Sequence, residues 1–525
     1  MGLCQRSILL PVIRWIVWRS VITIDYCLSH LIMASTSANL NDLGFDIFEH
    51  IISHLRNEGQ QGIVPLSLLS KQIRQHMLPV MFHNVCWPKD RSQFLPSSVW
   101  PYIKKLEFIY KSDYKQPLWV SQSRHGPSMK LLSAALPHIP NLATFVYSPD
   151  FPPNFDLIDA LASTPSLHTL HIPTSFLVHD ALTVFNSFHG VHDLVIEQVG
   201  KATLYDAPES KRLLSVQCVA NIIQGCSETL ESLEIPGEYC PLPNLLQRIS
   251  LPVIRNFLLT GFPPLDSDSQ NYPLWTVVQS MQKLKVLEVH CRLRVIGASP
   301  HRYELLPPNA AQDQNNLFSS RIESITISNP SFSDQIFKFL PHSLRSLILD
   351  FIPDSWENML LSGNDTMLAY HKPEMIVRLL KSLPSSRPNL EQLCIKMGWC
   401  VTTNMLAGIY QCFPGLRALE LQGIRYFNRA EEPESDMAGI VAVLEELEFL
   451  HTLKLAVEFK EDSYREGLRQ ERKIGSVDEA MQHWANIFRK RIKSLRDLAF
   501  EKRRHTGKGY GRRAAIGAPL WVWFS

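Results

Sequence analysis

The sequence has almost no net charge and no closely spaced cysteine pairs. Its 525 residues include 52 Lys and Arg against 50 Asp and Glu, a formal charge of +2. A nearly neutral chain has no global field that attracts nucleic acid or an anionic membrane. Ten cysteines are present, but none form the Cys-x-x-Cys pairs of zinc sites. In so long a chain they do not make a disulfide framework, so we expect reduced, mostly buried thiols in a cytoplasmic or nuclear protein.

Motifs that mark catalytic centres are also missing. There is no Gly-x-Ser-x-Gly elbow, no phosphate-binding P-loop and no Gly-x-Gly-x-x-Gly after a strand. His50 and His54 stand four residues apart, but no third metal ligand or neighbouring general base accompanies them. We therefore predict no catalytic residue, no metal site and no cofactor, and a protein that is not an enzyme.

Residues 1–39 contain an apolar run from Ile8 to Ile24 that could be taken for a membrane anchor. Arg14 and Arg19 oppose insertion, since each costs roughly 2.5–3.5 kcal/mol at the centre of a membrane helix. Pro11 also interrupts a helix. We interpret residues 1–39 as an extension without a folded role, with Met33 as the functional start, and predict no membrane association.

Residues 40–86 predict a small helical module. Apolar residues recur at helical spacing through the first helix, from Leu43 to Leu55, and a second helix begins near Pro65 after a glycine-containing break. Three helices this short cannot bury all their apolar side chains among themselves. Part of this surface is therefore expected to contact another protein, unless the module caps the domain that follows.

This module resembles an F-box. The positions that match the family pattern are Leu43, Asp46, Ile47, Ile51, Leu55, Leu66, Leu69, Ser70, Lys71, Arg74, Pro79, Phe82 and Val85. Gly44 departs from it, because the family usually has proline there. The resemblance implies docking on the Skp-family adaptor of a cullin–RING ubiquitin ligase. The adaptor-binding residues would be Leu43, Ile47, Phe48, Ile51, Leu55, Leu66, Leu69, Lys71, Arg74, Pro79 and Phe82.

Residues 100–505 repeat one local pattern, apolar-x-x-apolar-x-apolar, usually after a helical stretch. The thirteen triads are Ile103/Leu106/Phe108, Leu142/Phe145/Tyr147, Leu167/Leu170/Ile172, Val191/Leu194/Ile196, Leu230/Leu233/Ile235, Ile254/Phe257/Leu259, Leu284/Leu287/Val289, Ile322/Ile325/Ile327, Leu344/Leu347/Leu349, Leu390/Leu393/Ile395, Leu416/Leu419/Leu421, Leu450/Leu453/Leu455 and Leu495/Leu498/Phe500. In each triad the last two residues share one face of a short strand, and an upstream helix such as 157–161 covers that side.

The repeats resemble a leucine-rich-repeat solenoid, in which each strand and helix bury their apolar faces only against neighbouring repeats. The fold class is therefore predicted as α/β, a three-helix F-box followed by an irregular solenoid; the alternative is an ordinary α/β domain with leucine-rich helices. The family's Asn or Cys, three places after the last apolar residue, is absent. The residues found there include Ser175, Glu238, Arg292, Gly398 and Ile424. Without a hydrogen-bonded ladder we expect looser turns.

Residues that flank the central position of each triad are predicted to face a bound protein. The candidate substrate-binding residues are Thr169, His171, Ser232, Glu234, Glu288, Thr326, Glu420 and Lys454. Their mixed chemistry suits protein recognition better than nucleic acid, which requires a cationic groove. Excursions at about 201–214, 261–275, 296–318, 350–372 and 424–440 lie between the repeats, as specificity loops or as tolerated insertions.

The C-terminal region is locally basic. Residues 489–513 hold eleven Lys and Arg against two acidic residues. This cluster is interpreted as the solvated end of the last repeat followed by a tail, residues 506–525; a nuclear-import signal or a nucleic-acid contact is the alternative. The apolar segment 519–524 is too short to span a bilayer.

These features together predict the substrate-recognition adapter of an SCF-type ubiquitin ligase. The F-box would dock on the Skp-family adaptor and its cullin complex, and the repeats would hold an unknown protein substrate. The alternative from a different class is a repeat scaffold without a ligase role, in which the N-terminal helices form an end cap. A nucleic-acid binder that acts through the basic tail is a third reading.

Overall fold

A computed structural model describes most of the chain beyond residue 70. The described residues are 71–87, 94–109, 118–177, 182–198, 204, 207–241, 249–264, 274–292, 294–296, 299–301, 303–306, 321–351, 373–383, 389–397, 401–423, 436–457, 477–502 and 520–524. The chain divides into two units, Met1–Val85 with Leu95–Lys104, and Cys86–Phe94 with Lys105–Ser525. Most of the predicted F-box lies outside the described residues.

The described part of the first unit consists of helix α5 (Lys71–Met81), the 3-10 helix η2 (Ser97–Tyr102) and the start of strand β1 (Asn84–Trp87). Helix α5 passes through Pro79 and buries Met77 completely. Lys104 donates its backbone N–H to the carbonyl of His83 at 3.0 Å, which joins the two described segments of this unit.

The second unit is built on one long sheet whose strands follow chain order. The strands are β2 (Lys105–Phe108), β3 (Thr144–Tyr147), β4 (Thr169–Pro173), β5 (Asp193–Glu197), β6 (Ser232–Pro236), β7 (Asn256–Thr260), β8 (Val286–Val289), β11 (Ser324–Ser328), β12 (Ser346–Asp350), β13 (Gln392–Met397), β14 (Ala418–Gly423), β15 (Thr452–Leu455), β16 (Asp497–Lys502) and β17 (Leu520–Phe524). From β2 to β16 neighbouring strands pair in parallel, whereas β17 is antiparallel to β16. Strands β9 (Arg294–Ile296) and β10 (Ser299–His301) form a separate hairpin.

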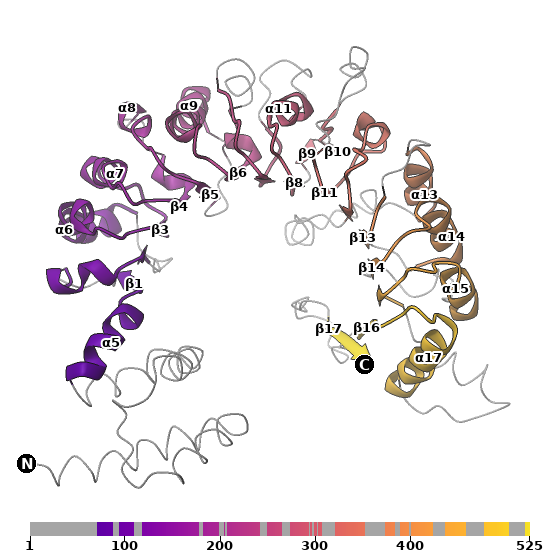
Figure 1. Cartoon of the computed structure of the whole chain (residues 1–525). Helices are drawn as coiled ribbons and strands as arrows, with labels where there is room; N and C mark the ends of the chain where they lie inside the picture. The colour runs from indigo at the N-terminus through magenta and orange to yellow at the C-terminus, as the bar shows by residue number, and fades with distance from the viewer. Residues whose placement is uncertain are drawn as a thin grey trace, which may run out of the picture. The chain divides into compact units, whose positions relative to one another are not determined.

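The described α-helices of this unit lie on one side of the strands (Figure 1). They are α6 (Leu118–Ala135), α7 (Phe155–Ala162), α8 (Leu182–Phe185), α9 (Glu209–Cys226), α11 (Leu274–Ser280), α13 (Pro373–Lys381), α14 (Thr403–Cys412), α15 (Met437–Leu444) and α17 (Val477–Arg491). Short 3-10 helices complete several repeats: η3 (Leu136–His138), η4 (Thr174–Phe176), η7 (Gly237–Tyr239) and η9 (Gln335–Lys338). One-sided cover in chain order is the solenoid arrangement, and it differs from a doubly wound sheet, which carries helices on both faces.

Helix α7 shows how the sequence sets this layer. Asn154 caps its first turn by accepting the backbone N–H of Leu157 at 3.2 Å. Leu157, Ile158 and Leu161 are buried toward the strands, as their helical spacing predicts. The predicted helix at 157–161 is therefore confirmed.

The central residues of the thirteen triads form one continuous row across the sheet. They are Leu106, Phe145, Leu170, Leu194, Leu233, Phe257, Leu287, Ile325, Leu347, Leu393, Leu419, Leu453 and Leu498, and each pairs with the next. None is more than 1% exposed. Every triad therefore marks one described strand, and the predicted repeat pattern is confirmed.

Polar side chains form hydrogen bonds between the turns of neighbouring repeats, which the absence of the family's Asn or Cys did not lead us to expect. Ser175 donates to the carbonyl of Pro149 in the preceding repeat at 3.1 Å. Buried Asn329, at φ 52°, donates to the carbonyl of Cys291 at 3.0 Å. Both Asn329 and Cys291 stand two places after the last apolar residue of their triads, one place earlier than the family pattern. Asn329 therefore supplies one such bond to the preceding repeat, one place earlier than the family pattern.

Candidate protein-binding surface

The predicted substrate-binding residues share the strand face opposite the α-helices. Six of them occupy one row of the sheet register, one position after the buried centre of each strand: His171, Glu234, Glu288, Thr326, Glu420 and Lys454. Thr169 and Ser232 lie in a second row, one position before the centre. We call this face, between β2 and β17, the open strand face, because no described α-helix covers it (Figure 1). All eight are half-buried except Thr326, which is 4% exposed.

On β4 to β8 the open strand face carries carboxylates and imidazoles. His171 Nε2 lies 3.2 Å from a carboxylate oxygen of Glu197, and His290 Nε2 lies 3.1 Å from one of Glu288. Glu234 stands on β6, between these two pairs. Its pKa is raised by burial, and the charges of Glu197 and Glu288 raise it further, although both histidines act in the opposite direction. This half of the face therefore offers carboxylate and imidazole groups to a hydrogen-bonding partner.

On β12 to β17 the same face carries lysines and indoles. Lys396 pairs with Asp350 at 3.1 Å, and Lys454 pairs with Glu420 at 2.8 Å. Burial alone would lower the pKa of Lys396, but the charge and hydrogen bond of Asp350 outweigh it and leave that pKa raised. Lys454 Nζ lies 5.9 and 5.5 Å from the ring centres of Trp521 and Trp523, within cation–π range. The two halves of the face thus differ in chemistry.

A line of ionisable residues immediately before the strands was not predicted. This strand-start column comprises His168, His192, Glu231, Arg255, Lys285, Glu323, Arg345, Glu391, Arg417, His451 and Arg496. Each residue after the first donates its backbone N–H to the carbonyl of the one before, at 2.7–2.8 Å. Because consecutive members come from different repeats, the column joins neighbouring repeats at one edge of the sheet.

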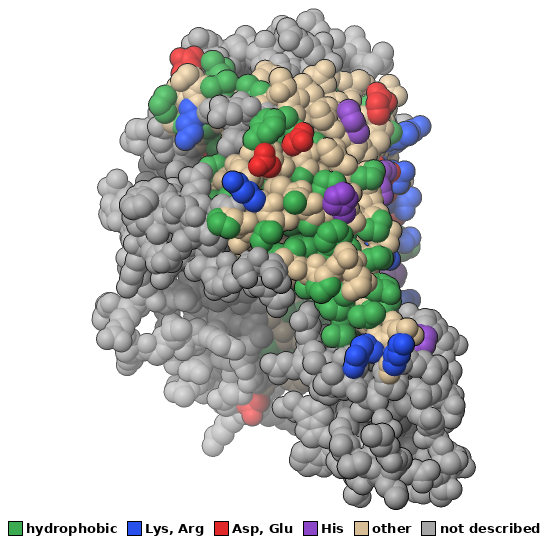
Figure 2. Space-filling model, turned by 90° about the vertical axis from the view of Figure 1, so that its left-hand side faces the viewer, with side chains coloured by type: hydrophobic (Ala, Val, Ile, Leu, Met, Phe, Trp, Pro, Cys, Tyr) green, Lys and Arg blue, Asp and Glu red, His purple; other side chains and the backbone are tan. Residues whose placement is uncertain are grey.

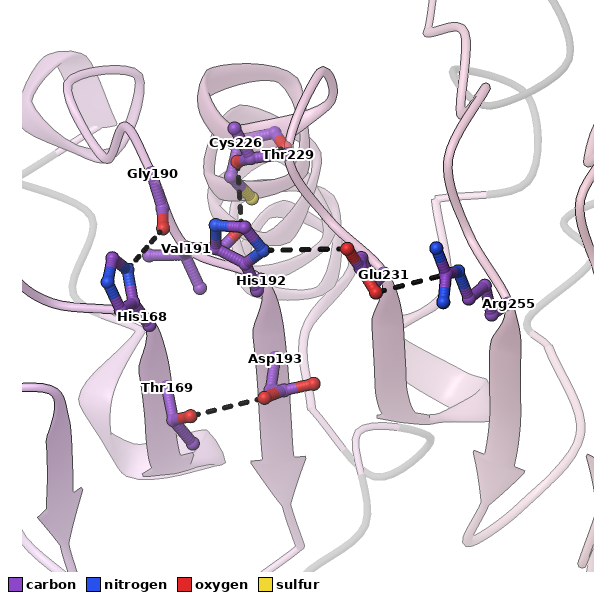
Figure 3. Close-up of polar contacts among 10 residues, drawn as sticks. All are labelled: His168, Thr169, Gly190, Val191, His192, Asp193, Cys226, Thr229, Glu231 and Arg255. Carbon is purple, nitrogen blue, oxygen red and sulfur yellow. Dashed lines mark hydrogen bonds and ion pairs between the residues drawn. The ribbon is translucent and has the colours of Figure 1, made fainter.

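Side chains reinforce this column (Figure 3). Glu231 lies 3.8 Å from His192 and 3.6 Å from Arg255, and Thr169 donates to Asp193 on the adjacent strand. Further along, Glu391 lies 3.7 Å from Arg345 and 4.0 Å from Arg417. Exposed pairs of this kind contribute about 0–1 kcal/mol each. Their main effect is to place opposite charges on neighbouring repeats, which favours the observed register.

The side of the molecule shown in Figure 2 is poor in charge. Hydrophobic and uncharged side chains dominate its described surface, several Lys and Arg side chains line its right-hand edge, and the other ionisable side chains are scattered over the face. Charged groups are thus unevenly distributed over the described surface.

The described cysteines are free thiols, and five of the seven are buried. Burial raises the pKa of Cys218, Cys226 and Cys394 to about 12 in each case. Exposed Cys86 donates to Glu107 at 3.4 Å, and burial together with that carboxylate raises its pKa as well. None of these four environments favours a thiolate nucleophile. Within the described ranges no group of three His, Cys, Asp or Glu residues is placed to hold a metal ion.

The predicted adaptor-binding residues are described only in part. Lys71, Arg74 and Pro79 are exposed on helix α5, and Phe82 directly after it is half-buried. The remaining seven, Leu43, Ile47, Phe48, Ile51, Leu55, Leu66 and Leu69, lie outside the described residues. Among the helices that are described, none is long and apolar enough to cross a membrane.

Comparison with known proteins shows a likeness to solved structures. No family model matches the chain, and no curated protein matches it. Among solved structures, the crystal structure of the Rad7 and Elc1 complex in yeast aligns with a TM-score of 0.36 and 11% sequence identity. The alignment covers 88% of this chain and 92% of that chain.

Proposed function

We propose that this protein is a substrate-recognition adapter of an SCF-type cullin–RING ubiquitin ligase. The F-box-like module, residues 40–86, docks on a Skp-family adaptor, and the open strand face holds a protein substrate. The chain has no catalytic centre of its own in this proposal. It raises the local concentration of the substrate near a ubiquitin-charged enzyme that another subunit recruits. The proposal places the protein in the cytoplasm, the nucleus or both.

The observation that carries the proposal is the order and spacing of the F-box-like residues from Leu43 to Val85, directly before a solenoid. The solenoid supports it independently, since it presents a long strand face lined with half-buried polar side chains. Such a face suits a protein ligand, because the carboxylates and imidazoles of β4 to β8 and the lysines and indoles of β12 to β17 differ in chemistry. A groove that binds nucleic acid would instead require a row of positively charged side chains.

Co-purification with a Skp-family adaptor tests the docking half. The double variant Ile51→Asp and Leu55→Asp places two charges on the predicted apolar helix face and should abolish adaptor capture. The matched control, Ser53→Asp and Asn57→Asp, introduces the same charges away from that face and should preserve capture. Circular dichroism should show the solenoid folded in both variants. If the unmodified chain captures no adaptor, the protein is a scaffold without a ligase role.

Proximity labelling under proteasome inhibition tests the substrate half. Replacing Glu234, Glu288 and Glu420 by arginine reverses the charge of one row on the open strand face and should remove substrates while adaptor capture persists. The control places the same number of charge reversals on the helix side, at Glu209, Asp159 and Glu374. An unchanged set of labelled proteins in the first variant would show that substrates bind elsewhere.

A further inference from the structure

Strand β17 (Leu520–Phe524) ends the sheet and has a strand neighbour on one side only among the residues described here. Residues of a strand direct their N–H and C=O groups alternately to its two sides. Those that face away from β16 therefore form an edge that can accept another strand. Arg489 of helix α17 donates to the carbonyl of Phe524, which fixes the end of β17 against its own repeat.

This edge lacks the features that normally prevent pairing between molecules. The strand reads Leu520-Trp521-Val522-Trp523-Phe524, without a charge, a proline or a glycine. Trp523 is 54% exposed, although it is a large apolar side chain. Natural edge strands usually carry lysine, proline or a bulge that blocks addition of a further strand. β17 carries none of these.

The sequence of β17 is nearly the same in both directions about Val522. An antiparallel pair of two such strands centred on Val522 sets Trp521 opposite Trp523 of the partner subunit, and Val522 opposite Val522 of the partner subunit. Leucine then lies opposite phenylalanine at both ends. Aromatic cross-strand pairs stabilise antiparallel sheets, and a two-fold axis through the central pair makes the interface isologous. Self-complementarity of this kind favours a second copy over an unrelated strand.

The neighbouring charges are compatible with this arrangement. Lys454 Nζ lies 5.9 and 5.5 Å from the ring centres of the two indoles. Its charge is compensated by Glu420 at 2.8 Å. The lysines of two facing copies are therefore each paired within their own chain and add little repulsion.

We propose that β17 is a homodimerisation strand, which pairs antiparallel with β17 of a second copy and continues the sheet across two solenoids. The occupant of the edge is this chain itself. The contact uses the outer backbone edge of β17, whose Trp521 and Trp523 side chains also lie on the open strand face.

Light scattering during size-exclusion chromatography of the full chain tests the proposal. The unmodified protein should change from the mass of one chain to that of two as its concentration rises. The variants W521K/W523K and W521E/W523E each set like charges opposite one another, and should raise the dimer Kd by about tenfold or more. An equimolar mixture of these two variants should recover the dimer, because lysines then face glutamates.

The variant W521K/W523E is the matched control. It changes the same two positions but sets lysine opposite glutamate within its own homodimer, so it should dimerise better than either like-charge variant. Hydrogen exchange of the β16 amides reports whether the strand pair survives in each variant. A single-chain mass for the unmodified protein at all concentrations would overturn the proposal and leave the edge free for a different chain. Equal dimerisation of all variants would also overturn it.

Discussion

Asp334 should stabilise one loop of the solenoid through three backbone hydrogen bonds. Its carboxylate accepts the N–H of Leu305 at 2.7 Å, of Leu306 at 3.0 Å and of Ile336 at 3.0 Å. The residue is 4% exposed, so water does not readily replace these bonds. Leaving a buried N–H without an acceptor costs about 1–3 kcal/mol. The change Asp334→Ala should therefore cost about 3 kcal/mol or more locally.

Amide hydrogen exchange measures this cost where it arises. A loss of about 3 kcal/mol corresponds to roughly a hundredfold faster exchange at Leu305, Leu306 and Ile336 when exchange follows local opening. Amides of the distant strand β14 should be unaffected and serve as the internal control. Unchanged exchange at all three amides would show that the carboxylate does not hold this loop.

The same carboxylate should make stability depend on pH. Burial raises the pKa of Asp334 from 3.8 to about 7, despite the three N–H donors and with a further contribution from the charge of Glu304. The folded state therefore keeps the proton up to about pH 7, whereas the unfolded chain releases it near pH 4. Stability from this group is fully present below pH 4 and is lost as the pH rises to about 7, by about 4 kcal/mol.

The variant Asp334→Asn does not titrate, so its free energy of unfolding supplies the reference. The difference between the unmodified protein and this variant, measured by urea denaturation at several pH values, should fall between pH 4 and 7. A difference that grows over this range would refute the reasoning, because it would mean that the N–H donors keep the carboxylate charged in the folded state.

Three further experiments test the packing of the repeats. Leu347→Ala, at a position 1% exposed, should destabilise the protein by about 2–5 kcal/mol in urea denaturation, and half-buried Ile348→Ala by clearly less. Thr402 accepts the N–H of Met405 and caps α14, so Thr402→Ala should cost about 1 kcal/mol in thermal unfolding. A Cβ at Gly408 would lie 3.2 Å from Val377, so Gly408→Ala should be tolerated better in a Val377→Ala background, in a double-mutant cycle.

The strands of the solenoid could be predicted from the sequence because their signal is local. The first residue of each triad lies in the turn before the strand, and the other two stand two positions apart on the buried face of the strand. This pattern occurs once per repeat. The pairing register of neighbouring strands could also be predicted, because their central residues, such as Leu233 and Phe257, must share one buried layer. The open strand face then follows from alternation alone.

Contacts between distant segments could not be predicted in this way. Glu391 lies between Arg345 and Arg417, which are 46 and 26 positions away, and the pairing depends on where each repeat begins. Asp334 reaches back 28 and 29 residues to a segment inside the excursion at 296–318. The sequence assigned the segment 519–524 only to a tail, because its strand character becomes evident only when β16 lies beside it. Spacing within the sequence carries no information on such partners.

The parallel register also determines how a substrate would contact the open strand face. Neighbouring strands lie about 4.8 Å apart, so a polypeptide that crosses them meets a new row of side chains at each step. On β4 to β8 these are mainly imidazoles and carboxylates, with Glu234 near the middle, whereas on β15 to β17 they are Lys454 and two tryptophans. A single substitution in the row changes the side chain that a bound polypeptide meets on one strand and leaves the other strands unchanged. Inserting one residue into a strand would instead exchange its open and buried faces beyond the insertion and place polar side chains in the core, so substitution is the less disruptive way to change this face.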